Sequence, residues 1–376
     1  MKLYPFFILV IILCSSCSNK QKYDSKSTTL EVDLTEQNVS FNELFSHIEV
    51  IPLETQDSCL IIEIEKVMLH QDLFYIFDQR KPAIYVFTKN GTFIKEIAGK
   101  GEGPGEFQAV TDMILDDARQ NIILLSPFGS FFIYDMEGRF LQQQTLPIKP
   151  NYYAISSLQD NAFAVWSCVE TEDAGISVIH TDSMKILHET WHNDRILDMG
   201  LMKPFYQYNA ETYFSTAYQN TVYQIKSDSL EKAYQWDFGK DNIEPNHLLT
   251  YTEIKDAHEK NNKLLKDLEE GILPYAMERH NQNDSYYYVA LRKGVGFNRP
   301  WINVFYRKQD GKSFVFDRTK EGIPIHPILF TNDFLVATMA SEDIYSYNKV
   351  LSEKEYEKLK SYSADDNPCL VKLYFK

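Results

Sequence analysis

The chain has 376 residues and a formal net charge of −15, with 53 acidic residues against 38 lysines and arginines. Nucleic-acid backbones are bound by clustered basic residues, and here the basic residues are scattered, so the charge pattern excludes nucleic acid as an expected partner. We interpret the acidic excess as a well-solvated surface, with an acidic docking patch as the alternative. Tyrosine and phenylalanine number 24 each against only 15 glycines, which favours many short pleated strands around a sizeable core.

The first residues have the pattern of an export signal. Lys2 gives a small positive charge, Phe6–Leu13 is an apolar run, and Ser15 and Ser16 are the small residues before a cleavage point. The apolar run is too short to span a bilayer. We therefore predict a signal peptide over residues 1–16, followed by a polar, flexible tether over residues 17–27.

Two strand-like segments follow the tether, Thr28–Leu34 and His47–Leu53. Both precede the first complete repeat. In a circular arrangement of sheets, an extra N-terminal strand commonly pairs into the last sheet and removes its exposed edge. We expect one or both segments to close the ring in this way.

A repeated group of short strands covers the rest of the chain. Its first copy contains Leu73–Asp78, Ala83–Phe87 and Thr92–Ile97, with the Lys89-Asn90-Gly91 turn between the last two. The second strands of successive copies are predicted to begin near Leu73, Asn121, Ala162, Thr212, Tyr286 and Asp333. Most of these starts are 41 to 50 residues apart, the length of a four-stranded propeller blade. The sequence therefore predicts an all-β fold, a six-bladed β-propeller over residues 28–376.

One interval is longer, at 74 residues, because residues 244–280 have a different pattern. Pro245 introduces leucines and isoleucines at helical spacing among charged residues. We predict one or two amphipathic helices inserted between blades 4 and 5, either as a packing cap on the rim or as a mobile lid. A second helical segment, Ser352–Leu359, begins at a serine suited to capping its first turn.

The most unusual run of the chain is Gly99–Phe107, which contains four glycines and one proline. No Lys-Ser or Lys-Thr pair follows it, and Glu102 and Glu106 would repel a phosphate, so it does not match a phosphate-binding loop. We interpret it as the crossing from the outer strand of one blade to the inner strand of the next. Glu102 and Glu106 remain candidates for ligand binding if they point to the mouth of the central channel.

The five cysteines are Cys14, Cys17, Cys59, Cys168 and Cys369. They are too few for a disulfide framework, and the last three show no zinc-like spacing. Cys59 and Cys369 would be neighbours if the two termini share a sheet. We expect two buried free thiols there, with a disulfide as the alternative.

Gly99–Phe107, Asp112 and the turn at residues 135–138 resemble an NHL-type repeat, and Cys14-Ser15-Ser16-Cys17 resembles the lipobox of bacterial lipoproteins. Over nearly its whole length, from Ile51–Thr55 to the last strand, the chain resembles the six-bladed, TolB-like β-propeller lipoproteins of Bacteroidota. That resemblance implies a lipid on Cys17, a membrane anchor and a location in the cell envelope. It implies no established reaction. Because residues 18–22 are neutral to basic, we expect an outer-membrane anchor with the domain facing the periplasm.

Aromatic residues recur where the chain leads into successive inner strands, and they suggest a surface for a glycan, a peptide or an envelope protein. The candidate ligand-binding residues, besides the two glutamates, are Tyr152, Tyr153, Phe205, Tyr206, Arg299, Trp301 and His326, with Phe107 and Tyr208 at similar positions. Packing between blades is the alternative role for each ring. We expect a binding protein that catalyses no reaction and needs no cofactor.

The alternative function is a hydrolase or lyase with a calcium or other divalent ion on the axis, as in some propellers that resemble this chain. Such a site needs several oxygen or nitrogen ligands that converge on the axis. The residues that could supply them are Asp112, Asn151, Asn209, His280, Asn281 and His326. Each of them is also a normal turn or rim residue.

Overall fold

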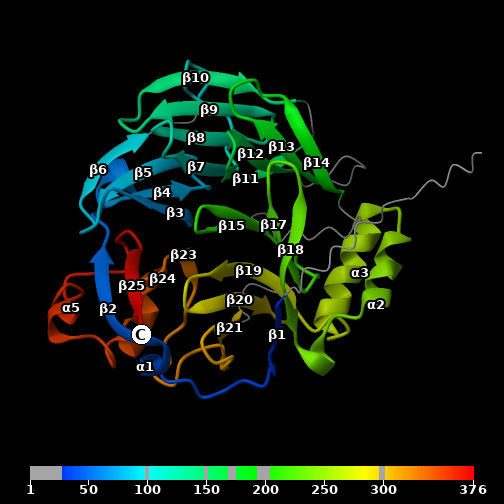
Figure 1. Ribbon diagram of the computed structural model, residues 1–376. Coiled ribbons are helices and arrows are strands. Elements are labelled where there is room, and N and C mark those ends of the chain that lie inside the picture. The colour runs from blue at the N-terminus through cyan, green and yellow to red at the C-terminus, as the bar shows by residue number, and fades with distance from the viewer. Residues whose placement is uncertain (1–27, 98–100, 148–150, 168–174, 193–203, 296–300) are drawn as a thin grey trace, which may run out of the picture.

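The computed structural model describes residues 28–97, 101–147, 151–167, 175–192, 204–295 and 301–376. Six sheets surround a common axis and form a six-bladed β-propeller (Figure 1). Five of the sheets have four strands and one has five. The predicted all-β fold and the predicted number of blades are both confirmed.

The first three blades are each built from four consecutive antiparallel strands. Blade 1 contains β3 (Ile64–His70), β4 (Leu73–Asp78), β5 (Ala83–Thr88) and β6 (Phe93–Ile97). Blade 2 contains β7 (Asp112–Asp116), β8 (Asn121–Ser126), β9 (Ser130–Asp135) and β10 (Phe140–Thr145). Blade 3 contains β11 (Tyr152–Leu158), β12 (Ala162–Ser167), β13 (Gly175–His180) and β14 (Ile186–His192).

Blade 5 is likewise built from four consecutive strands, whereas blades 4 and 6 each include one strand from the N-terminal part of the chain. Blade 4 contains β15 (Phe205–Tyr208), β16 (Glu211–Phe214), β17 (Thr221–Ile225), β18 (Leu230–Asp237) and the N-terminal β1 (Thr28–Glu31). Blade 5 contains β19 (Ala276–Gln282), β20 (Tyr286–Arg292), β21 (Trp301–Arg307) and β22 (Ser313–Phe316). Blade 6 contains β23 (Pro327–Phe330), β24 (Phe334–Met339), β25 (Cys369–Phe375) and the N-terminal β2 (Phe45–Pro52).

The second and third strands of a blade are apolar on both faces because each blade packs between two others. β4 and β8 are buried along almost their full length. Side chains on one face of β4 pack in a cluster with blade 2, and side chains on its other face pack in a cluster with blade 6. Strands covered on both faces lose the apolar-polar alternation. This explains the near-continuous apolar runs that identified them in the sequence.

The N-terminal segment contacts blades 4, 5 and 6. β2 pairs antiparallel with β25 and completes blade 6, so the predicted closing strand is confirmed for this segment. β1 has a different partner: it pairs parallel with β18 and covers the edge of blade 4. Between them the chain crosses blade 5, where Gln37 N donates to Val315 O at 2.7 Å, and forms α1 (Phe41–Leu44). Of the two segments expected to close the ring, β2 therefore does so in blade 6, and β1 extends blade 4 instead.

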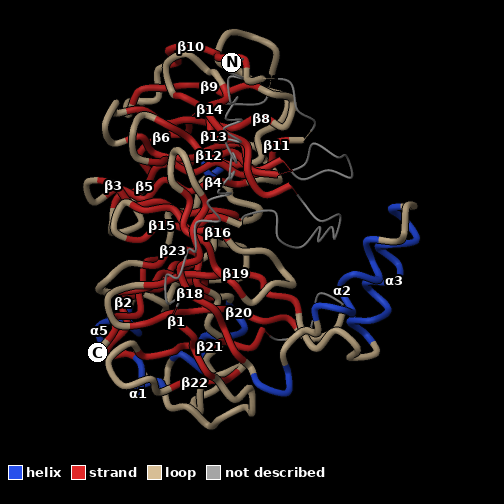
Figure 2. The backbone as a smooth tube through the Cα atoms, turned by 45° about the vertical axis from the view of Figure 1, so that its right-hand side comes forward, coloured by secondary structure: helices blue, strands red, loops and turns tan. Residues whose placement is uncertain are grey.

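The predicted insertion between blades 4 and 5 is helical. It contains η2 (Gly239–Asp241), α2 (Pro245–Thr252) and α3 (Ala257–Glu269), and the two α-helices project beyond the sheets (Figure 2). Leu264 and Leu268 are buried in the core that joins blades 4 and 5. Asp267 accepts hydrogen bonds from Tyr251 and, at 2.5 Å, from Lys263. The insertion is thus packed on the propeller at its base, and residues 276–280 of the predicted segment belong to β19.

The remaining short helices lie near the two chain ends. They are η1 (Asp57–Cys59), η3 (Ser341–Asp343), α4 (Ile344–Tyr347) and α5 (Glu353–Glu357). Ser352 caps α5, as predicted, by accepting a bond from Glu355 N. The Glu355 carboxylate accepts from Val50 N at 2.6 Å, and Lys358 Nζ donates to Val50 O at 2.9 Å. These two side chains satisfy backbone groups on the open edge of β2 that a further strand would otherwise pair.

Cys59 and Cys369 are both buried and free, as predicted. Burial raises the pKa of the Cys369 thiol to about 12. Cys369 Sγ and Cys59 Sγ each have a backbone carbonyl as hydrogen-bond acceptor. We infer that both are packing residues.

Candidate functional site

The strand directions divide the propeller into two faces. The first strand of each blade is the inner one. We call the face at which the inner strands begin the leading face. The face at which they end is the trailing face. Connections between blades lie on the leading face, as do the loops between second and third strands. Insertions such as α2 and α3 therefore also start from the leading face.

Several inner strands are irregular near the leading face. The register shifts within the first three residues of β3, β11 and β23, and between Met277 and Arg279 in β19. A bulge places two residues opposite one and changes the direction of the side chains beside it. In blade 5 the bulge places Arg279 toward blade 6, where its Nη1 donates to Pro327 O at 2.6 Å.

Arg279 meets two of the predicted ligand-binding residues. Trp301 is the first residue of β21, and His326 directly precedes β23. The Arg279 guanidinium carbon lies 5.6 Å from the centre of the Trp301 ring. The rings of Trp301 and His326 pack edge to face, with centres 5.4 Å apart and planes inclined by 68°. We call Arg279, Trp301 and His326 the Trp301 site; all three side chains are partly exposed.

The surroundings of His326 favour its neutral form in this site. Burial lowers its pKa, and Arg279 lowers it further, while Asp343 raises it and Arg318 lowers it. A neutral imidazole offers one hydrogen-bond donor and one acceptor. The Trp301 site thus combines a flat apolar ring, a guanidinium with several N–H donors and an imidazole in its neutral form. This combination suits the binding of a small polar group rather than nucleophilic chemistry.

Glu102 and Glu106 lie away from this site, in the connection between blades 1 and 2. The Glu106 carboxylate accepts from Gly103 N at 2.8 Å within its own loop, and Glu102 accepts from Gln108 Nε2 at 3.3 Å. Tyr134 donates to Gly105 O at 2.5 Å, which attaches the loop to blade 2. Residues 101–107 are therefore an inter-blade crossing, as predicted, and Glu106 stabilises the turn. Residues 99 and 100 lie outside the described residues.

The aromatic residues do not form one ring around the mouth. Tyr152 is fully buried between blades 2 and 3, and Tyr206 is buried between blades 4 and 5, where its hydroxyl is 2.8 Å from that of Tyr234. Tyr153 and Phe205 are partly buried against a common cluster of blades 3 and 4. The packing alternative thus holds for Tyr152 and Tyr206, because blades this close need large side chains to fill the space between them.

The residues considered for a metal ion are spread over several blades. Asp112 is bound by Lys66 Nζ at 2.8 Å and by Ile155 N at 3.0 Å, so it joins three inner strands. Asn151 and Asn209 are exposed and have positive φ, as turn residues do. Asn281 and His280 lie side by side in β19. Within the described ranges, no group of three or more His, Cys, Asp or Glu side chains is placed to hold a metal ion.

His280 is buried between blades 4 and 5. Its Nδ1 lies 2.8 Å from Ser215 Oγ, and its Nε2 has no hydrogen-bond partner among the residues that the structure describes. Burial lowers the pKa of His280 to about 3. A serine–histidine pair can support nucleophilic catalysis, but Ser215 is only 1% exposed, so no substrate reaches it in this conformation.

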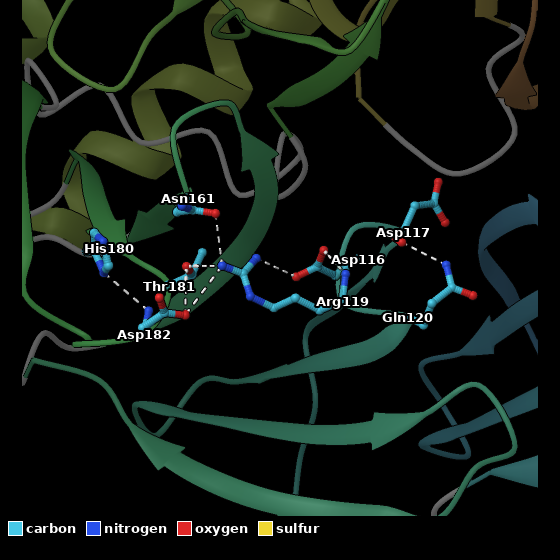
Figure 3. Close-up of polar contacts among 8 residues, drawn as sticks. All are labelled: Asp116, Asp117, Arg119, Gln120, Asn161, His180, Thr181 and Asp182. Atoms are coloured by element: carbon cyan, nitrogen blue, oxygen red, sulfur yellow. Dashed lines mark hydrogen bonds and ion pairs between the residues drawn. The ribbon is translucent and has the colours of Figure 1, made fainter.

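The trailing face carries a different arrangement of polar side chains (Figure 3). Arg119, in the turn after β7, reaches from blade 2 to blade 3 and donates to Thr181 at 2.6 Å and to Asn161 at 3.1 Å. Its ion pairs are with Asp116 at 3.1 Å and Asp182 at 3.3 Å. We call these five residues the Arg119 cluster; every one of its charges has a partner of opposite charge.

Among the described residues, cavities occur at three places away from the Trp301 site. One of 430 Å³ lies between the Asn90-Gly91 turn and Tyr362, and one of 440 Å³ lies between His47 on β2 and α5. The third, of 270 Å³, lies between Leu268 of the insertion and Gly294 of blade 5. All three have mixed polar and apolar walls, and none of them contains a residue of the Trp301 site.

Two predicted residues cannot be placed. Cys17 and Arg299 lie outside the described residues. Sequence reasoning missed Arg279, although a signal was present: an arginine within the strand Ala276–Gln282 must either find a polar partner or reach solvent. The sequence identified Trp301 and His326 separately, and only the fold brings them together.

The six sheets define the protein as a six-bladed β-propeller with a helical insertion. Its N-terminal strand β2 completes blade 6, and the partly exposed Trp301 site lies on its leading face. The chain belongs to the family described as "Domain of unknown function (DUF4934)", which matches residues 28–374. A search of curated proteins found no match. Among the described residues, no helix is both long and apolar enough to cross a membrane.

Two solved structures from Bacteroides share the fold. The first, from Bacteroides fragilis NCTC 9343, is named "Putative exported protein"; it has a TM-score of 0.76 and 18% identity over 93% of this chain and 100% of its own. The second, a member of the DUF4221 family from Bacteroides vulgatus ATCC 8482, has a TM-score of 0.53 and 11% identity over 91% of this chain and 99% of its own. At these identities the likeness concerns the fold alone.

Proposed function

We propose that the protein is a lipid-anchored envelope lipoprotein of the TolB-like or NHL-like group whose propeller binds a glycan or protein partner without catalysing a reaction. The binding site is the Trp301 site on the leading face. The observation that carries this proposal is the meeting of Trp301, Arg279 and His326, from three separate segments, with part of each side chain open to solvent. Aromatic and arginine side chains are the ones most often responsible for binding energy.

Further exposed apolar side chains on the same face extend the proposed surface. Phe128, in a loop of blade 2, is 73% exposed, and Tyr345, beside blade 6, is 76% exposed. Single exposed apolar side chains are common on protein surfaces, and these two bear on the proposal because they lie on the same face as the Trp301 site. They favour a partner that covers the leading face around the Trp301 site.

The test of binding is a pull-down from native envelope with the wild-type protein and with Trp301→Ala. Loss of a specific partner or glycan in the variant supports the proposal. Trp236→Phe, at a buried ring of blade 4, controls for a general effect on folding. If the captured material is the same for wild type and Trp301→Ala, the Trp301 site is not the binding site.

The proposed anchor rests on the likeness of Cys14–Cys17 to a lipobox and on the structural likeness to a Bacteroides protein named as exported. A lipid on Cys17 and the polar residues 18–27 would hold the propeller at the periplasmic side of the outer membrane. After cell lysis, Cys17→Ala is expected to move the protein from the membrane fraction to the soluble fraction. Ser25→Ala, in the predicted tether and outside the lipobox, is the control and should leave the distribution unchanged. Membrane association of Cys17→Ala would contradict the anchor.

A further inference from the structure

We infer that the Trp301 site takes a sugar that carries a carboxylate, and that Arg279 holds this carboxylate. The inference rests on the proposed function, because it names the ligand class of the same site. It starts from the charges of three neighbouring arginines. Arg292 forms an ion pair with Glu278 at 2.7 Å, and Arg318 forms one with Asp343 at 3.0 Å.

Arg279 is different from these two arginines. In the part of the chain that the structure describes, no carboxylate lies within ion-pair distance of its guanidinium. With the lowered pKa of His326 favouring its neutral form and with Arg292 and Arg318 paired, the three side chains of the Trp301 site retain the positive charge of Arg279. A partly buried cation without a counter-charge is costly, and an anionic ligand would remove that cost.

The donors of Arg279 are available to such a ligand. A guanidinium has five N–H donors, and among the described residues Arg279 makes one hydrogen bond, from Nη1 to Pro327 O. Nε and Nη2 of Arg279 have no hydrogen-bond partner among the described residues, and neither atom is buried. Both therefore reach solvent. A planar pair of N–H groups matches a carboxylate in two-point geometry.

The other two side chains favour a sugar over an acidic peptide. The Arg279 guanidinium lies over one face of the Trp301 ring, and the part of the ring that stays exposed is an apolar surface on which the C–H face of a pyranose ring can stack. The neutral His326 can exchange a hydrogen bond with a hydroxyl group. An aspartate or glutamate side chain offers the carboxylate but no ring to cover Trp301.

The charge of the whole protein narrows the ligand further. The unpaired Arg279 lies on a chain with a net charge of −15. The surrounding field repels densely charged polyanions and tolerates a ligand with isolated carboxylates. We therefore expect uronic acid residues within an otherwise neutral glycan rather than a heavily sulfated chain.

The inference is tested on an array of neutral, carboxylated and sulfated glycans and acidic peptides, probed with the wild-type protein. The best carboxylated glycan is then titrated beside its methyl ester, which has the same sugar ring without the charge. We expect the ester to bind at least tenfold more weakly, which corresponds to about 1.4 kcal/mol. Raising the salt concentration should reduce this difference.

Three variants assign the effect to residues. Arg279→Gln should lose the preference for the carboxylate over the ester, and Arg279→Lys should keep part of it because the charge remains without the fork. Arg318→Gln is the matched control: its arginine is already paired with Asp343, so the preference should stay. Trp301→Ala should weaken carboxylate and ester alike.

The outcomes separate this inference from the proposed function. Three results would overturn the inference that the ligand is a carboxylated sugar. The acid and the ester could bind equally well, the preference for the acid could persist in Arg279→Gln, or only acidic peptides could bind. If Trp301→Ala still abolished binding in those cases, the proposed function would stand. The inference would also be wrong if no probe bound, or if binding were unchanged in both Arg279→Gln and Trp301→Ala. The proposed function would be wrong if Trp301→Ala captured the same material as wild type in the envelope pull-down.

Discussion

Two arginines on opposite faces of the propeller carry different roles. Arg119 and Arg279 are both partly buried, and both reach from one blade to the next. Arg119 meets two carboxylates, a hydroxyl and an amide, whereas Arg279 meets one backbone carbonyl and an aromatic ring. A polar side chain that is paired with carboxylates and hydrogen-bonded to the next blade, such as Arg119, links neighbouring blades. A cation without a carboxylate partner, such as Arg279, is available for a ligand.

The same distinction separates other polar groups of the core. Asp112 is fully matched between three inner strands, and its side chain is 2% exposed. His280 is only half matched, because Nδ1 has Ser215 as a partner and Nε2 has none. Four predictions test this contrast.

The largest expected effect is that of Asp112→Ala. This change leaves Lys66 and Ile155 N without their shared carboxylate, and breaking a buried ion pair on one side costs about 3–5 kcal/mol of the free energy of unfolding. Urea unfolding of wild type and variant measures the difference. Asp117→Ala is the control: Asp117 pairs with His70 but its side chain is 73% exposed, so its loss should cost about 0–1 kcal/mol. Equal losses would show that matching within the core is unimportant.

The second prediction concerns acid. The pKa of His280 is about 3 in the folded protein and near its ordinary value of 6.5 after unfolding, so the unfolded chain binds one more proton between these values. Stability should therefore fall as the pH drops from 6.5 toward 3, by up to about 1.4 kcal/mol per pH unit from this group. His280→Gln should flatten the dependence of the unfolding free energy on pH over this window. The exposed His258→Gln should leave the slope as in wild type.

The third prediction concerns the Arg119 cluster. Arg119→Ala leaves the buried Asp116 carboxylate without its cation and removes the link to Thr181 in blade 3. A loss of about 2 kcal/mol is expected, because an orphaned buried acceptor costs about 1–3 kcal/mol. Thermal unfolding at neutral pH measures the loss. An unchanged midpoint would mean that the cluster does not hold blades 2 and 3 together.

The smallest expected effect is that of Arg279→Ala on stability. The change removes one hydrogen bond and one cation–π contact and leaves no carboxylate unpaired, so the loss should be below about 1 kcal/mol, less than for Arg119→Ala. Measured beside Arg119→Ala in the same unfolding experiment, the pair compares a matched with an unmatched arginine. A larger loss for Arg279→Ala would reverse the roles assigned to the two residues.

Much of the fold was predictable because the signals are local. Apolar runs such as Leu73–Asp78, the Asn90-Gly91 turn and the helical spacing after Pro245 each depend on a few neighbouring residues, and they specified the blades and the insertion. The partner of β1 was not predictable, because a strand edge can accept any extended segment of suitable polarity. The candidate site was predicted in part: Trp301 and His326 were singled out, and Arg279 was not.

By itself the sequence determined the number of blades, the place of the helical insertion and the closing of the ring by an N-terminal strand, and it favoured free thiols at Cys59 and Cys369. These depend on local patterning, length and cysteine count. Only the tertiary structure decided which aromatic rings fill the space between blades and which reach solvent. It also decided that Arg279 lies beside Trp301 and His326 without a carboxylate. The physical reason is that burial and charge pairing depend on neighbours contributed by other blades, and no short stretch of sequence contains them.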